Sequence, residues 1–342
     1  MKIGFFTDSY FPGIDGVTYT IKAWKERLED RGHEVHVVYP DNPEYEPGEN
    51  EHPVKSLPNL LYSQYRLPLY RRISTLPELD VVHCHGPAST GIIGRRYASK
   101  NDVKSVYTHH TPIEDYLIRG LKSEILADLA GKLWVFYENK FLEGFDCVTA
   151  STSKISRKVK PEKLPVGLEM EFFSPVDSDM FDGEDVIGYS GRMSKKKNLE
   201  EVLKLAEEMP EKRFVLVGEG PQRPKLERKA PDHVEFRDFL EREELPEFYS
   251  AIDVFITAST CDTLGLSTLE ANACGTPVAA ADVQPFGRTI EEENGSRFEY
   301  GDIESMRNSV EDCLEKSRDT REAVKKYSIE ETVNKLEEIY EA

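Results

Sequence analysis

The sequence predicts an α/β protein built from two doubly wound parallel-sheet domains that face each other across a cleft. A chain of 342 residues is longer than one simple core usually needs, so two domains are the better expectation. Short apolar runs alternate with helical stretches, which is typical of a parallel sheet covered on both faces. This alternation is interrupted near the middle of the chain and then starts again. Hydrophobic residues make up 39% of the chain, as in a globular protein.

The first domain is predicted over residues 1–165. A buried strand, rather than a signal peptide, is expected at 2–7 (KIGFFT). A helix follows, because Val17, Ile21, Trp24 and Leu28 recur every three or four residues, and Gly32 is placed to end it. Further strands are expected at 34–38 (EVHVV), 80–85 (DVVHCH), 103–108 (VKSVYT) and 146–150 (DCVTA).

An irregular stretch with proline and glycine, residues 166–183, is the predicted linker, and the second domain is expected over 184–327. Its strands are predicted at 185–191 (DVIGYSG), 213–220 (RFVLVGEG), 233–239 (HVEFRDF), 253–259 (DVFITAS) and 276–282 (TPVAAAD). The last helix, 328–342, is amphipathic. It either closes the second domain or packs back on the first.

Composition limits the functions that are open to the chain. Residues 1–165 contain 22 acidic and 22 basic residues, so the remainder carries the whole net charge of −19. An acidic half argues against non-specific nucleic-acid binding, which needs a basic surface. The five cysteines are odd in number and scattered, which fits reduced thiols in a cytoplasm. The sequence contains no run of eighteen apolar residues, so no membrane-spanning helix is predicted.

The loop at residues 8–16 (DSYFPGIDG) is a candidate anion site. Gly16 stands where the first helix is expected to begin, and amides at a helix N-terminus attract anions. A tight turn that needs glycine for backbone reasons explains the same residue. The spacing is not G-x-G-x-x-G, so a nicotinamide-binding loop loses its main support.

The stretch SGRMSKKKN, directly after the first strand of the second domain, is a stronger candidate. Arg192 and Lys197 lie five residues apart on a loop that is expected to open a helix, and a guanidinium with an ammonium suits a diphosphate. Three lysines at a helix N-terminus oppose its dipole unless an anion offsets them. The alternative is a solvated basic helix start, and Lys195 and Lys196 fit that description.

Two carboxylates flank a predicted helix start in DTLGLSTLEANACGTPV. Asp262 lies in the loop, Leu266 starts the helix and Glu270 follows one turn later. Eight residues span at most roughly 12 Å at about 1.5 Å per residue, comparable with the reach from a sugar across a diphosphate to a ribose. Amides of Leu266 and Ser267 would face the phosphates, and each carboxylate would accept hydrogen bonds from hydroxyls. A dipole-stabilising acid and an exposed glutamate are the plainer explanation.

These residues together resemble the retaining glycosyltransferases of family four, which have the GT-B fold. The resemblance runs in order along nearly the whole chain. FTDSYFPGIDGV is similar to the first-domain glycine loop, DVVHCHGP to the histidine strand and YTHHTPIEDY to the YHT…DY segment. GYSGRMSKKKN and VLVGEGP resemble the diphosphate motif with its companion strand, and DTLGLSTLEANACGTPV resembles the E-x7-E motif.

The resemblance implies a role for each matched residue. Gly16 contacts the donor phosphate, Arg192 and Lys197 hold the diphosphate, Glu270 binds the ribose and His110 lies beside the reacting sugar carbon. The sequence departs from the family pattern at Asp262, where glutamate is usual, and at Asp238, where glycine is common. The shorter Asp262 leaves the identity of the donor sugar open.

Other patterns are weaker. His83 and His85 point to one side of a strand and Cys84 to the other, so they do not predict a metal site. His109 and His110 cannot both face the cleft if that segment is extended, and the resemblance selects His110. A serine hydrolase is disfavoured because no G-x-S-x-G elbow exists.

The predicted function is transfer of a hexose from a UDP- or GDP-linked donor to a hydroxyl acceptor, with retention and without metal or other cofactor. A membrane lipid is the expected acceptor and an anionic inner membrane face the expected location, because cations and apolar residues are interleaved between Glu51 and Glu78. These residues are Lys55, Arg66, Arg71, Arg72, Leu60, Leu61, Tyr62, Tyr65, Leu67, Leu69 and Tyr70. A soluble sugar or polyol acceptor, a same-fold epimerase or phosphorylase, and a non-catalytic nucleotide-sugar binder stay open.

Overall fold

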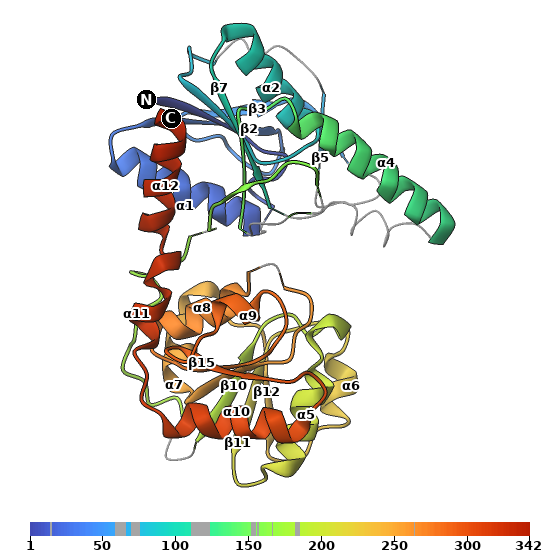
Figure 1. Cartoon of the computed structure of the whole chain (residues 1–342), viewed down its shortest axis with the longest axis vertical. Helices are drawn as coiled ribbons and strands as arrows, with labels where there is room; N and C mark the ends of the chain where they lie inside the picture. The colour runs from blue at the N-terminus through green and yellow to red at the C-terminus, as the bar shows by residue number, and fades with distance from the viewer. Residues whose placement is uncertain are drawn as a thin grey trace. The chain divides into compact units, whose positions relative to one another are not determined.

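The computed structural model describes residues 1–13, 16–58, 66–69, 76–110, 124–151, 155, 157–165, 167–181, 185–262 and 264–342. The chain forms two compact units (Figure 1). The first contains Met1–Gly167 and Ile329–Ala342, and the second contains Leu168–Ser328. The chain therefore leaves the first unit once and returns to it with its last helix.

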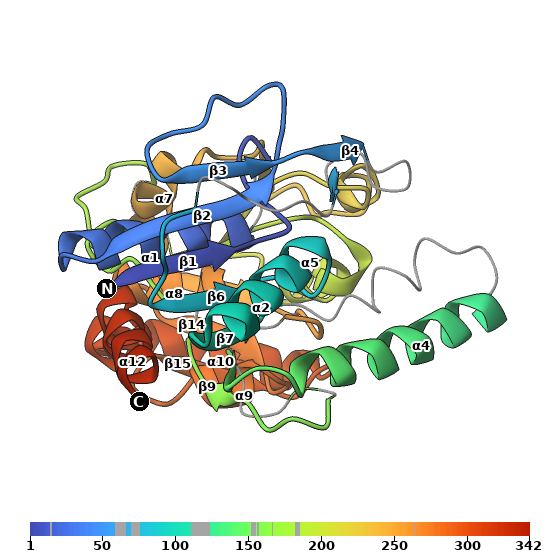
Figure 2. The same ribbon diagram turned by 90° about the horizontal axis from the view of Figure 1, so that it is seen from above.

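The first unit is built on a parallel sheet of seven described strands in the order β3-β2-β1-β6-β7-β8-β9. Figure 2 shows β3, β2, β1 and β6 in this succession. The strands are β1 (Lys2–Phe6), β2 (Glu34–Pro40), β3 (Glu51–Val54), β6 (Val81–Cys84), β7 (Lys104–His109), β8 (Cys147–Ala150) and β9 (Glu162–Lys163). The helices are α1 (Gly16–Asp30), α2 (Ser89–Asn101), α4 (Glu124–Leu142) and α12 (Ile329–Glu341). A separate antiparallel pair is formed by β4 (Ser56–Pro58) and β5 (Arg66–Pro68).

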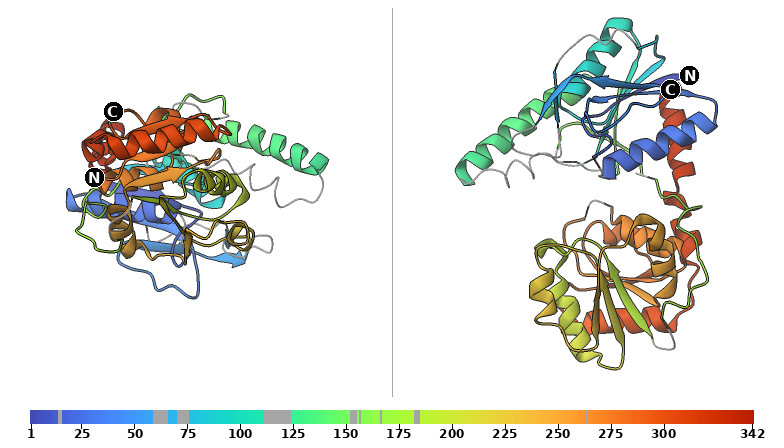
Figure 3. Two further views of the ribbon diagram at one scale, coloured as in Figure 1. Left: turned by 90° about the horizontal axis from the view of Figure 1, so that it is seen from below. Right: turned by 180° about the vertical axis from the view of Figure 1, so that it is seen from behind.

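Two apolar cores cover the two faces of this sheet. Phe5 belongs to one core and Phe6 to the other, because neighbouring side chains of a strand point to opposite faces. The core around Phe5 includes Trp24 of α1 and Leu336 of α12, and α12 lies beside α1 (Figure 3). The last helix thus packs back on the first unit, which was one of the two alternatives.

The second unit has a parallel sheet in the order β12-β11-β10-β13-β14-β15. The strands are β10 (Val186–Ser190), β11 (Arg213–Val217), β12 (Val234–Arg237), β13 (Val254–Thr257), β14 (Val278–Ala281) and β15 (Gly295–Phe298). The helices are α5 (Leu199–Glu208), α6 (Arg223–Glu227), α7 (Leu245–Ala251), α8 (Leu266–Ala273), α9 (Phe286–Thr289), α10 (Ile303–Glu315) and α11 (Thr320–Val324), with single 3₁₀ turns η1 (Lys195–Lys197), η2 (Arg242–Glu244) and η3 (Lys325–Tyr327). Both sheets reverse their strand order beside the first strand, and ligands of such folds bind at that point.

Each strand expected from an apolar run is present, and the predicted doubly wound fold is confirmed. The helix predicted around Val17, Ile21, Trp24 and Leu28 is α1, and Gly32 adopts φ = +86° just beyond its end. The strands that sequence reasoning missed are short or polar edge strands, such as β3, β9 and β15. None of the helices described here is long and apolar enough to span a membrane.

Candidate active site

The second unit contains a cavity of about 500 Å³ beyond the carboxyl ends of β10 and β11. Its lining combines backbone of glycine-rich loops with polar and apolar side chains. The lining residues are Ser190, Gly191, Arg192, Val217, Gly218, Glu219, Gly220, Phe239, Leu240, Leu245, Tyr249, Ser267 and Glu270. Arg192, predicted from one motif, and Ser267 with Glu270, predicted from another, therefore line one cavity.

Glu270 reaches the cavity because α8 starts where the sequence predicts. Gly265 adopts φ = +77° before the helix, which begins at Leu266, and Glu270 lies one turn further on. The Tyr249 hydroxyl donates a hydrogen bond to Oε2 of Glu270 at 3.0 Å. Burial raises the pKa of the Glu270 carboxyl to about 7, against the opposing effect of the Tyr249 hydrogen bond. Leu266 is the first helical residue but is not among the residues that line the cavity.

Tyr249 and Phe239 also line the cavity, although the sequence analysis did not single them out. Tyr249 belongs to α7, and its hydroxyl reaches Glu270 only through the packing of α7 on α8. Phe239 follows β12 and exposes most of its ring, although it is a large apolar residue. Its exposure beside a cavity is a binding signal that the sequence alone does not give.

The three lysines lie in a turn directly before α5, as expected for a loop that opens a helix, and not on the first helical turn itself. Lys195–Lys197 form the separate turn η1, and Asn198 follows with φ = 51° before α5 begins at Leu199. Asparagine tolerates this left-handed conformation, so the chain turns between the lysines and the helix. The charges are thereby kept off the first turn of α5, which instead contains Glu200 and Glu201, as the helix dipole favours.

Lys197 contacts the first of the two predicted carboxylates. Its Nζ lies 2.6 Å from Oδ1 of Asp262, and Lys196 Nζ lies 3.3 Å from the Cys261 sulfur. The two loops are also tied by Asn198, whose side-chain amide donates to the carbonyl of Ala258 at 2.9 Å. The structure thus brings Lys197 and Asp262 together, although 65 residues separate them in the sequence.

In the first unit, Gly16 begins α1 as predicted. A Cβ atom built on Gly16 would meet no described atom within 4 Å, so crowding does not explain the glycine. Residues 14–15 before it lie outside the described part of the chain. The same loop contains Asp8, whose carboxylate accepts hydrogen bonds from the backbone amides of Ala88 (3.0 Å) and Thr90 (3.1 Å). Asp8 thereby fixes the start of α2, a role that its loop position did not predict.

His109 and His110 point to opposite sides, as expected for neighbouring residues of an extended segment. His109 ends β7 and its Nε2 lies 3.7 Å from Oε1 of the buried Glu138. His110 turns to the other side, where its Nε2 lies 3.1 Å from Nδ1 of His85. The rest of the motif, residues 111–123, lies outside the described part of the chain.

The histidine strand does not form a metal site among the described residues. His83 in β6 and His85 just after it have ring centroids 4.2 Å apart, and Cys84 between them packs in the core on the other side of the sheet. Across the described ranges, no group of three or more His, Cys, Asp or Glu side chains could hold a metal ion.

The predicted membrane segment is described only in part. Leu60, Leu61, Tyr62, Tyr65, Tyr70, Arg71 and Arg72 lie outside the described residues. Leu57 and Leu67 face each other across the β4–β5 pair and are 52% and 50% exposed. Arg66 is not a freely extended cation, because its Nε donates to Ser56 Oγ at 2.8 Å and its guanidinium lies 3.8 Å from Asp41.

Sequence comparisons cover both units. Residues 14–164 match the sequence profile of Glycosyltransferase Family 4, and residues 173–331 match that of Glycosyl transferases group 1. The chain is 30% identical over 338 residues to the alpha-monoglucosyldiacylglycerol synthase of Acholeplasma laidlawii, covering 87% of this chain and 85% of the relative. It is 27% identical over 305 residues to a GDP-mannose-dependent alpha-mannosyltransferase of Mycolicibacterium smegmatis, covering 82% and 80%.

Solved structures agree on the fold. Sucrose-phosphate synthase from Thermosynechococcus elongatus superposes with a TM-score of 0.74 at 20% identity, over 100% of this chain and 98% of that one. Anabaena Alr3699/HepE, solved in complex with UDP, superposes with a TM-score of 0.73 at 16% identity over the whole of both chains. With both profiles matched in order on two parallel-sheet units, the chain belongs to family four of the glycosyltransferases and has the GT-B fold.

Proposed function

We propose that this glycosyltransferase moves a hexose from a nucleotide-diphosphate sugar to a hydroxyl group of a membrane lipid, with retention of the anomeric configuration. The observation that carries the proposal is the cavity of the second unit, where Arg192 of one motif meets Ser267 and Glu270 of another. Relatives named as glucosyldiacylglycerol synthases support the lipid acceptor, and the UDP complex of a structural neighbour supports the donor class.

The cavity suits a nucleoside diphosphate. The carboxylate of Glu270 is an acceptor for ribose hydroxyls, and the ring of Phe239 offers an apolar surface on which a base can stack. Arg192 and the amides at the start of α8, including those of Leu266 and Ser267, are donors for the phosphates. Asp238, one of the two departures from the family pattern, is ion-paired with Arg223 at 2.8 Å. It would affect the loop that binds the base of the donor.

The chemical step requires stabilisation of the departing diphosphate. The bond between the anomeric carbon and the phosphate oxygen breaks as the acceptor oxygen bonds to that carbon on the same face. The acceptor proton passes to the departing phosphate oxygen, so no separate base is needed. Arg192, Lys197, the α8 amides and the amide of Gly16 stabilise the negative charge that develops. His110 and Asp262 orient the sugar while positive charge develops at its anomeric carbon.

Cations of the chain take the place of a divalent metal in this proposal. Transfer is therefore expected to persist in a chelator such as EDTA, and the product's anomeric proton coupling, measured by NMR, should match that of the donor. An inverted product would remove the retaining mechanism. Loss of transfer in EDTA with restoration by Mg²⁺ or Mn²⁺ would remove metal independence, without affecting the donor assignment.

A peripheral position on an anionic cytoplasmic membrane face is proposed for the first unit. Support comes from the exposed pair Leu57 and Leu67, with Lys55 exposed beside them. Half-exposed leucines next to a cation suit the headgroup boundary of a bilayer. The acidic charge of the second half of the chain would be repelled from the same surface.

A further inference from the structure

The imidazole of His110 is hydrogen-bonded to a second histidine from the neighbouring strand. His110 follows β7 and His85 follows β6, which pairs with β7. Nε2 of His110 lies 3.1 Å from Nδ1 of His85, and the two rings stack with centroids 5.4 Å apart. When both rings are neutral, one of these nitrogens carries the proton and the other accepts it.

The environment of the other ring nitrogen of His85, Nε2, determines whether His85 or His110 donates this hydrogen bond. His85 is buried, and its Nε2 has no hydrogen-bond partner among the residues that the structure describes. Burial holds the pKa of His85 well below its ordinary value, so the ring is neutral and has one N–H. A buried N–H without an acceptor costs more than a bare ring nitrogen. The proton of His85 therefore lies on Nδ1 and is donated to Nε2 of His110, which leaves a neutral His110 with its proton on Nδ1.

His85 is held in turn by a third histidine. The ring of His83 packs against it with centroids 4.2 Å apart, and His83 is fully buried. Nε2 of His83 lies 2.6 Å from the Thr108 hydroxyl, and Nδ1 lies 2.6 Å from the Tyr340 hydroxyl. Both ring nitrogens are thus bonded, which fixes the orientation of His83.

The hydrogen bonds of the Thr108 and Thr149 hydroxyls determine which nitrogen of His83 donates and which accepts. Thr149 donates to the Tyr107 carbonyl at 3.5 Å and therefore accepts from Thr108, whose Oγ1 lies 2.7 Å away. Thr108 then accepts from Nε2–H of His83. Burial holds the pKa of His83 well below its ordinary value, so Nδ1 has no proton and accepts from the Tyr340 hydroxyl.

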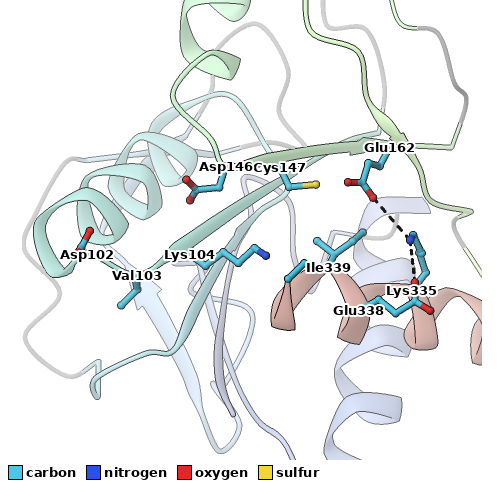
Figure 4. A pocket seen from close by; sticks show the side chains of 10 residues that line it. Asp102, Val103, Lys104, Asp146, Cys147, Glu162, Lys335, Glu338 and Ile339 are labelled. Atoms are coloured by element: carbon cyan, nitrogen blue, oxygen red, sulfur yellow. Dashed lines mark hydrogen bonds and ion pairs between the residues drawn. The ribbon is translucent and has the colours of Figure 1, made fainter.

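Tyr340 is brought to this strand by α12, which is held from two sides. Arg31, just after α1, pairs with Glu330 at 2.8 Å and with Glu337 at 2.6 Å. On the other side, Lys335 lies between Glu162 of β9 and Glu338, beside a polar pocket that Ile339 also lines (Figure 4). The last helix of the chain thereby delivers a hydroxyl donor to the buried histidines.

We propose that His85 and Tyr340 are positioning residues for His110. His85 selects the tautomer of His110 with its proton on Nδ1, and Tyr340 fixes His83, against which His85 packs. The inference rests on the proposed role of His110 at the reacting sugar. It gives the C-terminal helix a part in catalysis besides its part in the core.

Substitutions at His85 separate tautomer selection from packing. His85→Asn keeps an N–H near the position of Nδ1, whereas His85→Leu fills space without a donor. His85→Leu should lower kcat by about tenfold or more, as loss of a residue that orients a functional histidine does, and His85→Asn should recover most of that loss. Affinity for free UDP and GDP, measured by calorimetry, should stay unchanged because His110 is not proposed to touch the nucleotide. Equal kcat values for the two variants would overturn the tautomer assignment.

Tyr340→Phe tests the hydrogen bond from the Tyr340 hydroxyl to His83. Its result does not depend on whether the protein tolerates a substitution at His85. The change should lower kcat several-fold while leaving the KM for the donor and the nucleotide affinity in place. Tyr97→Phe is the matched control, because its hydroxyl bonds to the Pro77 carbonyl at 2.9 Å, outside the histidine network. Equal kcat for Tyr340→Phe and Tyr97→Phe would exclude a role for the Tyr340 hydroxyl.

His110→Ala distinguishes failure of this inference from failure of the proposed function. If His110→Ala loses turnover while His85→Leu and Tyr340→Phe keep it, the positioning roles are wrong and the role of His110 stands. If His110→Ala itself keeps normal turnover, the proposed role of His110 is wrong and this inference falls with it.

Discussion

The ammonium of Lys197 lies 2.6 Å from a carboxylate oxygen of Asp262, and the two residues come from different loops of the second unit. Both side chains are largely buried, so their attraction is stronger than that of a typical surface pair. A diphosphate bound at Lys197 would share this ammonium with Asp262. The pair therefore links the residue proposed for the sugar to the residue proposed for the phosphates.

Asp262 and Glu270 are predicted to act on different parts of the donor. Glu270→Gln should weaken binding of free UDP or GDP because the ribose loses a charged acceptor. Asp262→Asn should leave nucleotide binding intact or strengthen it, because Lys197 is released, while turnover falls. Calorimetry with free nucleotide and initial-rate kinetics measure the two effects, and equal weakening of nucleotide binding in both variants would refute the division. Asp262→Glu, which introduces the residue usual in the family, probes donor choice.

The diphosphate cations are predicted to act mainly in the transition state. Arg192→Ala and Lys197→Ala should each reduce kcat/KM by an amount equivalent to about 2–4 kcal/mol, as loss of a donor to a developing oxyanion typically does. Lys195→Ala is the matched control, since Lys195 is exposed in the same turn. Near-normal turnover in both test variants would rule out the assignment.

Nucleotide affinity should depend on pH through Glu270. Because burial raises the pKa of Glu270 to about 7, the carboxylate that accepts ribose hydrogen bonds forms only as pH rises through neutrality. Affinity for free UDP, measured between pH 6 and pH 8.5, should rise more steeply in the unaltered protein than in Glu270→Gln. Identical pH profiles would show that Glu270 does not titrate in this range.

The Glu270 carboxyl should also make the stability of the folded protein depend on pH in a definite direction. Its pKa is raised from 4.5 in the unfolded chain to about 7 in the folded protein, so the folded state binds the proton more tightly. This contribution is fully present below pH 4.5 and is lost as pH rises through 7. The melting temperature of Glu270→Gln relative to the unaltered protein should therefore be higher at pH 8 than at pH 5. A constant difference across that range would contradict the raised pKa.

Membrane attachment is predicted to depend on the apolar pair of the β4–β5 hairpin. A Leu57→Ser, Leu67→Ser double variant should float less with anionic vesicles than the unaltered protein, because half-exposed leucines contribute their burial at the headgroup boundary. Val176→Ser, a change of an exposed apolar residue in the second unit, should have no effect. Negligible binding of the unaltered protein to both anionic and neutral vesicles would remove the membrane proposal.

The parts of the fold that sequence reasoning predicted are those with a strong local signal. The buried central strands are continuous apolar runs, and α1 repeats its apolar residues with helical spacing. Edge strands such as β3 and β15 are mixed in polarity, because only part of each is covered, so they have no such signal. The amphipathic pattern of α12 predicts that one face is buried but does not specify against which unit. In the structure it packs in the core of the first unit.

The sequence predicts those parts of the candidate site in which neighbouring residues of one short motif determine the positions of the side chains. Gly265 and the start of α8 fix Glu270 within six residues of chain. Contacts between distant segments were not predictable, and Tyr249 with Glu270 and Lys197 with Asp262 are examples. The position of η1 was missed because Asn198, rather than a lysine, makes the turn into α5.

Lipid glycosylation is tested most directly by transfer of labelled sugar from UDP- and GDP-linked hexoses, with diacylglycerol-containing vesicles, a soluble sugar or polyol, or no acceptor. We expect label in the lipid fraction, dependent on vesicles and lost in Arg192→Ala. Label on the soluble acceptor alone would replace the lipid acceptor, and turnover that needs no acceptor would indicate an epimerase or phosphorylase. No turnover with any donor, despite nucleotide binding, would contradict the claim that this chain is a transferase.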